Sequence, residues 1–277
     1  MRDAIRKAIG GERSEHFGQA YEMLAPPPRT PGKPDVEARQ QWLKRCAETP
    51  VSKDYATYFA LWKASFPASC LREVTARSRL LIGHGNPSGS DVGLTVHQTW
   101  GVPIMPGTAL KGLLAHYIDA VYGDATDKAA QSWRGPTWTN GKPQAPGEDF
   151  ATMFGAPATG EEDTGGQRGW VEFHDALYVP DSATGNNPFA LDVLTVHQKD
   201  YYGDIGWPSD WDSPNPVGFV SVRPGTRFLL AVTTGSQPAG QALAKWRSLA
   251  IEQLTAALAE WGIGGKTAAG YGRLTSR

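Results

Sequence analysis

The chain has 277 residues and a mass of 29.9 kDa, which is enough for one large domain or two modest ones. Hydrophobic residues make up 40% and charged residues 20%, a balance that excludes a largely disordered chain because such chains bury too little apolar surface. The formal net charge of −1 argues against a free-standing, sequence-independent nucleic-acid binder, since such proteins attract the phosphate backbone with a strong positive field.

Cysteine content and hydropathy predict a cytoplasmic protein without membrane contact. The two cysteines, Cys46 and Cys70, are too few for a disulfide scaffold and lack the paired spacing of a zinc site. The amino terminus has no apolar run long enough for a signal peptide, and no later stretch approaches ~18 consecutive apolar residues.

Charge is unevenly distributed along the chain. Residues 221–277 hold seven Lys or Arg against two Glu, which leaves twenty basic and twenty-six acidic residues elsewhere. The carboxyl-terminal fifth therefore carries about +5 and the remainder about −6. This asymmetry allows a local surface for a polyanion, although chance clustering on a solvated face explains it equally well.

Residues 1–72 are predicted to form a helical amino-terminal extension. The segment PPPRTPGKP interrupts it because Pro removes backbone donors and fixes φ. Helices are expected afterwards at about 36–48 and 55–65. Residues 74–81 alternate with a period of two, which predicts the first core strand, and the loop GHGNPSGSDVG follows.

The middle of the chain predicts a helix and a strand separated by an insertion. The helix is expected to end at Gly123. Its apolar face consists of Leu110, Leu114, Tyr117, Ile118 and Val121. Residues 124–168 are dense in Gly, Pro and Thr and predict a loop-like insertion, and residues 169–179 resemble a second strand.

A second insertion is expected at about 180–216, because residues 186–216 are too rich in turn formers and aromatic residues for a regular element. Strands are predicted at 217–222 and 227–233. A long amphipathic helix follows at 241–261, stopped by Gly262, and the last strand is expected at 268–274.

The core elements occur in the order strand, helix, strand, strand, helix, strand. This is the βαββαβ order of the ferredoxin-like fold, which RRM domains use to lay single-stranded RNA on a sheet. We therefore predict an α+β protein with a helical extension at 1–72 and a ferredoxin-like domain at 73–277. The order alone fits many unrelated functions.

The segment GLTVHQTWGVPIMPGTALKG, residues 93–112, places Lys111 in the opening turn of a helix. A cation there is disfavoured by the helix dipole by up to ~1 kcal/mol, and a nearby anion would reverse that penalty. Free amides at the same helix start can seat a phosphate, with Lys111 adding a charge-assisted contact. A solvated lysine that tolerates the small cost is the equally weighted alternative.

The tail GIGGKTAAGYGR is rich in glycine, which allows its backbone to approach another chain closely. It resembles a P-loop only superficially. That motif needs Gly five residues before Gly265, where this chain has Glu260, and here the helix precedes the glycines instead of following them. A nucleotide-hydrolysing P-loop is therefore rejected.

The string LTVHQ occurs twice, ending in His97-Gln98 and His197-Gln198, with Asp91 and Asp192 a few residues upstream. Paired His and Asp are typical of metal sites and of acid-base catalysis. The favoured alternative is that each histidine ties its loop to a neighbour through hydrogen bonds.

Several aromatic residues lie in predicted loops, where they can stack on bases, anchor a protein interface or pin their own loops. They are Trp133, Trp138, Tyr201, Tyr202, Trp207 and Trp211. Four aspartates surround the later ones, which favours a protein partner over RNA at that place.

The ordered blocks GHG, GLTVHQTWGVPIMPGTALKG, MFG, GWVEFHDA, LDVLTVHQKDYY, NPVGFVSV and WGIGGKTAAGYGR resemble the RAMP superfamily. Within it, the resemblance is to the family of sixth subunits of the type III-B Cmr effector complex of CRISPR systems. The resemblance extends from about Leu80 to Arg273. It implies a hetero-oligomeric partnership with other Cmr subunits, CRISPR guide RNA and target RNA.

The resemblance also implies a non-catalytic subunit that holds the guide RNA toward its 3′ end, with no cofactor and no metal. Guide contact is carried over to His97, Gly107, Thr108, Lys111, Gly264, Gly265, Lys266, Thr267, Gly270 and Arg273. Two alternatives remain at this point: a guide-processing endoribonuclease that uses His97 or His197, and a scaffold that binds only protein.

Overall fold

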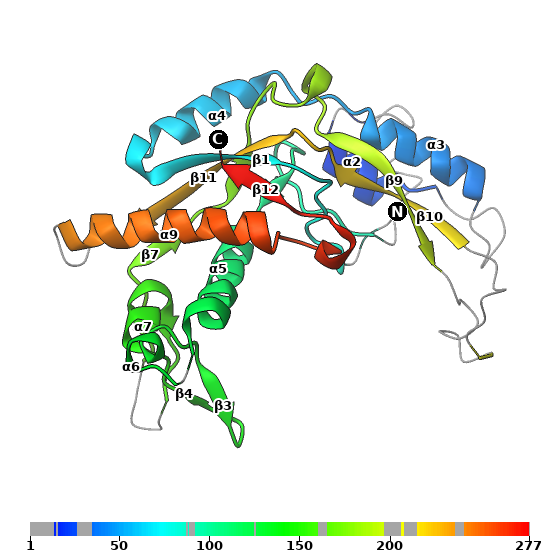
Figure 1. The fold of residues 1–277 in the computed structure, drawn as a ribbon. Helices are drawn as coiled ribbons and strands as arrows, with labels where there is room; N and C mark the ends of the chain where they lie inside the picture. Colours follow the sequence, from blue (N-terminus) through cyan, green and yellow to red (C-terminus); the bar gives the residue numbers. More distant parts are fainter. Residues whose placement is uncertain are drawn as a thin grey trace.

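The computed structural model describes residues 14, 16–26, 35–86, 88, 92–124, 126–159, 165–196, 206–207, 215–235 and 241–276. Helices and strands are mixed along this part of the chain (Figure 1). No helix within it combines the length and the apolar character needed to cross a bilayer.

A six-stranded antiparallel sheet lies at the centre of the molecule, in the order β12-β1-β11-β8-β2, with β7 also paired to β11 (Figure 1). Its strands are β1 (Leu71–Ala76), β2 (Ile104–Met105), β7 (Val171–Phe173), β8 (Ala176–Tyr178), β11 (Arg227–Thr234) and β12 (Leu274–Ser276). Val74 on β1 faces Phe228 on β11 and Ala76 faces Leu274 on β12. All four residues are buried, so pairing and core packing agree.

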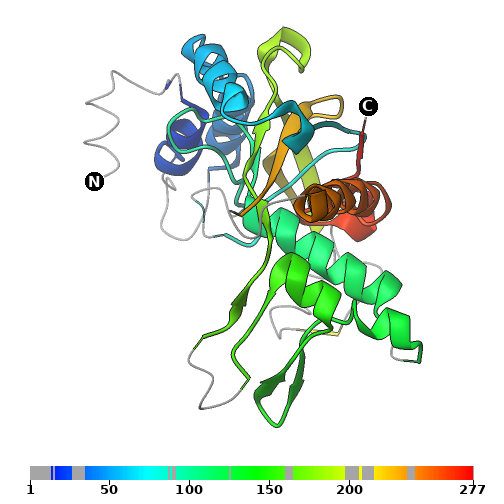
Figure 2. The ribbon, with the colours of Figure 1, turned by 90° about the vertical axis from the view of Figure 1, so that its left-hand side faces the viewer.

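Helices α5 (Gly107–Tyr122) and α9 (Gln241–Glu260) pack against each other below the sheet (Figures 1 and 2). The predicted helix at 110–121 is confirmed, and its apolar face is buried except at its end, where Val121 is 47% exposed. Across the helix pair, the Tyr117 hydroxyl donates to Glu260 at 2.9 Å, and its ring packs edge-on against Trp261.

The predicted boundaries of three strands are wrong. The first strand ends at Ala76, and Leu80 forms only an isolated bridge with Val222. The segment 169–179 is broken into β7 and β8, because it turns at His174 and Asp175. The last strand begins at Leu274, since Thr267–Ala269 forms the 3₁₀ turn η3.

The expectation that residues 186–216 lack a regular element is also wrong. After the 3₁₀ turn η2 (Thr184–Asn186), β9 (Phe189–Val196) pairs along its whole length with β10 (Asn215–Val222). The strand-forming residues FALDVLTV were outweighed in the sequence by the turn formers on both sides of them. Buried Phe189 and Phe219 anchor this second sheet, and α3 (Val36–Ala47) packs on it.

The helices predicted at 36–48 and 55–65 are confirmed as α3 (Val36–Ala47) and α4 (Asp54–Ala64), and α2 (Phe17–Met23) precedes them. Cys70 ends the 3₁₀ turn η1 (Ala68–Cys70), which leads into β1. Phe17 on α2 stacks on Phe189 of β9 with ring centroids 3.8 Å apart. Aromatic packing therefore joins the early helices to the second sheet.

Residues 124–168 were expected to be loop-like, yet their described part carries short elements that extend away from the sheet (Figure 2). These are α6 (Lys128–Gln131), β3 (Thr137–Thr139), β4 (Lys142–Gln144), α7 (Glu148–Phe154), β5 (Gly155–Ala156) and β6 (Gln167–Arg168). The dipeptide Asn140-Gly141, with both φ angles positive, forms the hairpin turn between β3 and β4. Asn-Gly is a strong hairpin signal, and the surrounding Gly, Pro and Thr residues obscure it in the sequence.

Candidate nucleic-acid interface

The start of α5 is in close contact with the end of β7. A Cβ atom at Gly107 would lie 2.2 Å from the carbonyl oxygen of Phe173, so only glycine fits there. The Gly107 N–H donates to the Asp175 carboxylate at 2.8 Å. The expectation of free amides at this helix start therefore fails at Gly107, because a carboxylate of the chain itself occupies that amide.

A cavity of about 350 Å³ opens beside this helix start. Thr108 and Lys111 line it from α5, and Arg168, Glu172 and His174 line the other side. Arg168 is paired with Glu172, so these two charges largely cancel. Lys111 has no ion pair among the described residues, which leaves its ammonium as the cation available for an anion.

His97 lies in the loop before β2, where both of its ring nitrogens have a neighbour. Nδ1 accepts from the Thr99 N–H at 3.2 Å, and Nε2 lies 3.3 Å from the Tyr58 hydroxyl. Because Nδ1 accepts, the ring proton of neutral His97 sits on Nε2. Burial lowers the pKa of His97 and the nearby Asp175 carboxylate opposes this only in part. The geometry supports the interpretation of His97 as a tie between loops.

The glycine-rich tail packs against residues 79–84 of its own chain. The Gly265 N–H donates to Leu81 and the Gly272 N–H donates to Arg79, both at 2.7 Å. A Cβ at Gly264 would lie 2.5 Å from the Leu81 carbonyl oxygen. The close approach predicted for these glycines is thus made within the molecule, and it fixes the shape of the tail.

Lys266 has the left-handed backbone conformation, with φ 61° and ψ 32°. This conformation costs a residue other than glycine on the order of 1 kcal/mol and occurs often at functional sites. The Lys266 carbonyl accepts from Ala269 and Tyr271 N–H groups, and Thr267 begins the turn that Gly270 ends. The fold therefore holds the Lys266 side chain at a defined point of the surface.

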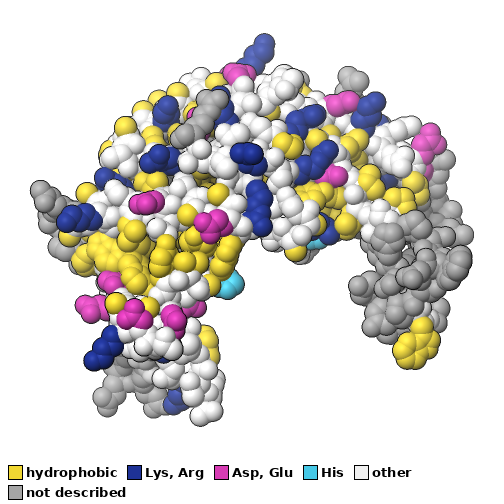
Figure 3. All heavy atoms as spheres, viewed as in Figure 1, with side chains coloured by type: hydrophobic (Ala, Val, Ile, Leu, Met, Phe, Trp, Pro, Cys, Tyr) yellow, Lys and Arg dark blue, Asp and Glu magenta, His cyan; other side chains and the backbone are white. Residues whose placement is uncertain are grey.

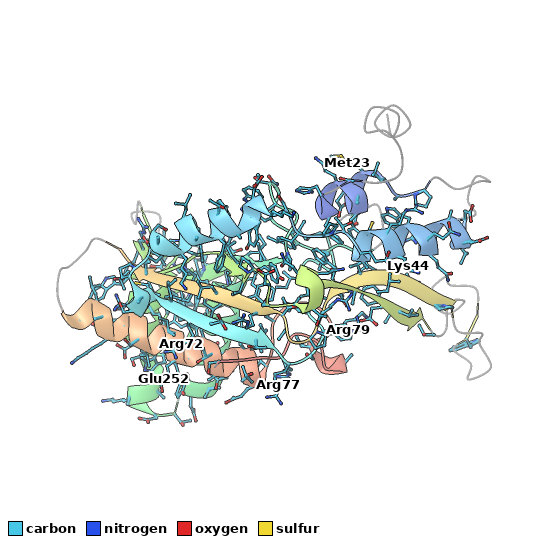
Figure 4. All side chains as sticks on the ribbon, turned by 90° about the horizontal axis from the view of Figure 1, so that it is seen from above. Met23, Lys44, Arg72, Arg77, Arg79 and Glu252 are labelled. Atoms are coloured by element: carbon cyan, nitrogen blue, oxygen red, sulfur yellow. The ribbon has the colours of Figure 1, made fainter. Side chains whose placement is uncertain are left out.

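Three arginines that the sequence analysis did not select lie on the same side of the molecule. Figure 4 shows Arg72, Arg77 and Arg79 along one edge, and Figure 3 shows Lys and Arg side chains gathered on that face. Arg77 donates its N–H to the Arg273 carbonyl at 2.7 Å, which places it beside the tail. The alternation in residues 74–81 was a signal for this, since it spaces Arg77 and Arg79 two residues apart.

Part of the Arg273 guanidinium lies inside the protein. Its Nη1 atom is buried and has no hydrogen-bond partner in the described structure. Arg77 and Lys266 have no ion pair there either, whereas Arg79 is paired with Asp192 at 3.3 Å. A guanidinium with an unmatched buried donor is stabilised when an anion binds.

The structure divides the predicted residues into two groups. One group surrounds the start of α5 and contains His97, Gly107, Thr108 and Lys111. The other is the tail, with Gly264, Gly265, Lys266, Thr267, Gly270 and Arg273. No hydrogen bond between described residues joins the two groups. His84 lies against Gly265 of the tail, and the N–H of Thr95, two residues before His97, donates to Ile82, two residues before His84.

The repeated LTVHQ string does not form a pair of matching sites in the described residues. The first copy leads to a loop, whereas Leu194, Thr195 and Val196 of the second copy lie in β9. Asp192 is paired with Arg79, and His197 and Asp91 lie outside the described residues. The described part of the chain contains no group of three His, Cys, Asp or Glu side chains able to hold a metal ion.

The loop aromatics differ in their surroundings. Trp133 packs against Trp246 with ring centroids 5.7 Å apart, so it pins its own segment. Trp138 and Trp207 are 69% and 91% exposed and are free to contact a partner. Tyr201, Tyr202 and Trp211 lie outside the described residues.

Comparison with known proteins gives a family, one relative and one solved structure of similar fold. The family model of the RAMP superfamily matches residues 73–275. The CRISPR system Cmr subunit Cmr6 of Pyrococcus furiosus is 28% identical over 229 residues. These cover 72% of this chain and 65% of the relative, so the chain spans less than two thirds of that protein's length.

A solved structure is similar in fold. It is a chain of the type III-B Cmr-beta complex bound to cognate target RNA, with a TM-score of 0.58 and 20% identity. The match covers 87% of this chain and 73% of that chain. Since the family model matches well over half of the sequence, this chain belongs to the RAMP superfamily.

Proposed function

We propose that this chain is a non-catalytic subunit of a type III-B CRISPR effector complex, where it holds guide RNA and adjoins other Cmr subunits and the target RNA. The observation that carries the proposal is the tail of the chain. There Lys266 and Arg273, together with Arg77 beside them, lack ion-pair partners in the described structure, and Lys266 is held in a strained conformation. Membership of the RAMP superfamily and the similarity to Cmr6 support it.

A local basic surface explains how a protein with a net charge of −1 can bind RNA. Phosphate binding requires cations at the point of contact, and the charge of the whole molecule mainly affects long-range attraction. Lys111 beside its cavity and the basic tail provide two such points. A single-stranded RNA that reached both would gain affinity by linking two weak contacts.

We further propose that residues 73–277 form a ferredoxin-like domain and residues 1–72 its helical extension. The strand order β12-β1-β11-β8 supports the first part, because the ferredoxin-like fold places its strands in the order 4-1-3-2. The helices α5 and α9 connect the strands that this topology requires them to connect. The two insertions of that domain would then be 124–168 and 180–216.

Catalysis by His97 is disfavoured by its hydrogen bonds. A general base must have a free nitrogen within reach of the proton that it removes. Nδ1 of His97 already accepts a backbone N–H, and Nε2 lies against Tyr58. We therefore propose a non-catalytic role for this chain. Incubation of the full chain with labelled repeat RNA checks it, and cleavage that His97→Gln abolishes would contradict this role.

Salt-dependent RNA binding tests the proposed contacts. Lys111→Glu and Lys266→Glu should each weaken binding of a single-stranded RNA, measured by fluorescence anisotropy on the full chain. Each lost phosphate contact should reduce the slope of log K against log salt by about 0.7. The matched control is Lys142→Glu, which makes the same charge change on the exposed hairpin of β3 and β4.

The control variant should bind like the unmodified chain. If Lys142→Glu weakens binding as much as Lys266→Glu does, the effect comes from total charge and the assigned contacts are wrong. Equal slopes for all four proteins would reject RNA contact at both Lys111 and Lys266.

A further inference from the structure

Aromatic side chains gather where α5, α9 and the insertion at 124–168 meet. Trp133 packs against Trp246 with ring centroids 5.7 Å apart, and Trp170 meets the same ring edge-on at 6.2 Å. The Tyr122 hydroxyl, at the end of α5, donates to Gln253 of α9 at 2.9 Å. These contacts join side chains from separate parts of the chain into one surface, called here the tryptophan surface. It consists of Val121, Tyr122, Trp133, Trp170, Trp246 and Leu249.

The tryptophan surface is only partly covered by the protein. Val121 is 47% exposed and Tyr122 is 39% exposed, and the three tryptophans are half-buried. Figure 3 shows hydrophobic side chains gathered over a broad area just below α9. A continuous apolar area on a surface marks an interaction site more often than scattered apolar residues do, and tryptophan is the commonest anchor of such sites.

Acidic side chains border this surface. The Asp119 carboxylate, one helical turn before Tyr122, accepts the Gly135 N–H at 2.7 Å. The Asp149 carboxylate accepts the hydroxyl of Ser132, the neighbour of Trp133, at 2.6 Å. Glu252 is exposed on α9, one helical turn after Leu249 (Figure 4). None of these three carboxylates has an ion-pair partner among the described residues.

The balance of charge around the surface is negative. The segments 113–135, 148–154 and 241–260 contain seven Asp or Glu and four Lys or Arg, which gives a net charge of −3. Hydrogen bonds from Thr126 lower the pKa of Asp124, which follows Tyr122 by two residues, so this carboxylate is ionised at neutral pH. In Figure 3 acidic side chains lie both above and below the hydrophobic area.

This combination of groups selects cations that are attached to an apolar scaffold. Carboxylates repel the phosphates of RNA, whereas they attract lysine and arginine. The face of an indole ring also attracts a lysine or arginine side chain. An amphipathic helix offers both parts at once, since apolar residues at helical spacing fill an apolar surface while cations beside them reach its border.

We infer that the tryptophan surface receives a basic amphipathic helix of a neighbouring protein subunit. The inference rests on the proposed function, since it needs a protein subunit to adjoin this chain. The charge of this surface is opposite to that of the tail with Lys266 and Arg273. The two surfaces therefore accept different classes of macromolecule, a basic protein segment in one case and RNA in the other.

Peptide binding to the full chain tests the inference. Two fluorescent peptides of about 18 residues, roughly five helical turns, carry leucine on one helical face and differ on the other face, which is lysine in one and glutamate in the other. Several ion pairs and a cation–π contact should make the leucine-lysine peptide bind about 10-fold more tightly at physiological salt, measured by fluorescence anisotropy.

Two variants of the surface should weaken binding of the leucine-lysine peptide in different ways. Val121→Ser should weaken it about 3-fold at every salt concentration, because it removes exposed apolar area. Glu252→Lys should weaken it about 3-fold at low salt and less at high salt, because screening reduces the added repulsion. The matched controls are Leu61→Ser on α4, where Leu61 is 70% exposed, and Glu48→Lys at the end of α3, and both should bind like the unmodified chain.

Equal affinity for the two peptides, or equal losses in the surface variants and their controls, would overturn the inference. It is also overturned if Val121→Ser reduces the affinity for single-stranded RNA, which makes RNA the occupant. Dissociation of a dimer of this chain by Val121→Ser in sedimentation experiments would overturn it as well, since a second copy is then the occupant. RNA binding that depends on Lys111 and Lys266 keeps the proposed function in all of these cases, whereas its absence in the unmodified chain rejects the proposed function.

Discussion

The structure changes the interpretation of His97. In the sequence it is a candidate acid-base residue, whereas in the structure its ring joins the loop before β2 to Tyr58 on α4. Burial, the largest effect, lowers its pKa below the ordinary value of about 6.5. At neutral pH the ring is therefore uncharged, and any contact it makes with RNA is a hydrogen bond.

The lowered pKa has a predictable effect on stability. Below pH 6.5 the unfolded chain binds a proton at His97 before the folded chain does, so the free energy of unfolding falls as the pH drops toward the folded-state pKa. The contribution of neutral His97 to the free energy of unfolding is fully present above pH 6.5. An NMR titration should give His97 a pKa below 6.5, and His97→Gln should lessen the fall in Tm between pH 7 and 5. A measured pKa at or above 6.5 contradicts the burial argument.

Helix α5 contains two glycines with opposite surroundings. At Gly107 a Cβ would lie 2.2 Å from a backbone oxygen of β7, whereas at Gly112 nothing lies within 4 Å. Gly107→Ala should therefore force the helix away from β7 and cost about 1–3 kcal/mol of stability. Gly112→Ala should stabilise the protein by about 0.5–1 kcal/mol, because alanine loses less conformational entropy in a helix.

Chemical denaturation of the two variants measures both effects in the same helix. RNA binding should also fall in Gly107→Ala, since the cavity beside Lys111 depends on that contact. If Gly107→Ala leaves stability unchanged or raises it as Gly112→Ala does, the contact between α5 and β7 is looser than the structure shows.

The elements also show where sequence analysis succeeds. The helices at 36–48, 55–65 and 110–121 could be predicted from the sequence. Their apolar residues recur at helical spacing, and residues such as Gly123 mark where a helix ends. The strand β9 was not, since its pairing with β10 joins residues up to 33 apart and is stabilised by Phe17 and Phe189. Tertiary contacts override local turn signals in such a strand.

The candidate interface was predictable in part for a related reason. Lys111 and Lys266 stand out in the sequence by helix position and glycine context. Arg77 does not, because its importance comes from a neighbour that the fold brings beside it, the tail. Spatial neighbours of this kind leave no regular spacing in a single sequence.

At the scale of the whole molecule, one polar cluster joins three parts of the chain. Arg79 pairs with Asp192 of β9 at 3.3 Å and donates to Ser221 of β10 at 3.1 Å. The Tyr271 hydroxyl donates to the same Asp192 at 2.7 Å. Burial, followed by this hydrogen bond, raises the pKa of Tyr271 to about 12. The cluster thereby connects the second sheet to the tail that carries Lys266.

Asp192→Asn should loosen this connection. The neutral amide no longer disfavours the phenolate, and Arg79 is left to favour it, so the pKa of Tyr271 should fall toward 10 in a spectroscopic titration that uses Tyr271→Phe to assign the signal. Hydrogen exchange should become faster in the tail at 264–272. Glu73→Gln is the matched control, because it breaks the Arg227 pair of the central sheet without touching the tail. If hydrogen exchange in the tail is equal in Asp192→Asn and Glu73→Gln, the packing of the glycines against Leu81 is sufficient to hold the tail. The second sheet then does not position Lys266.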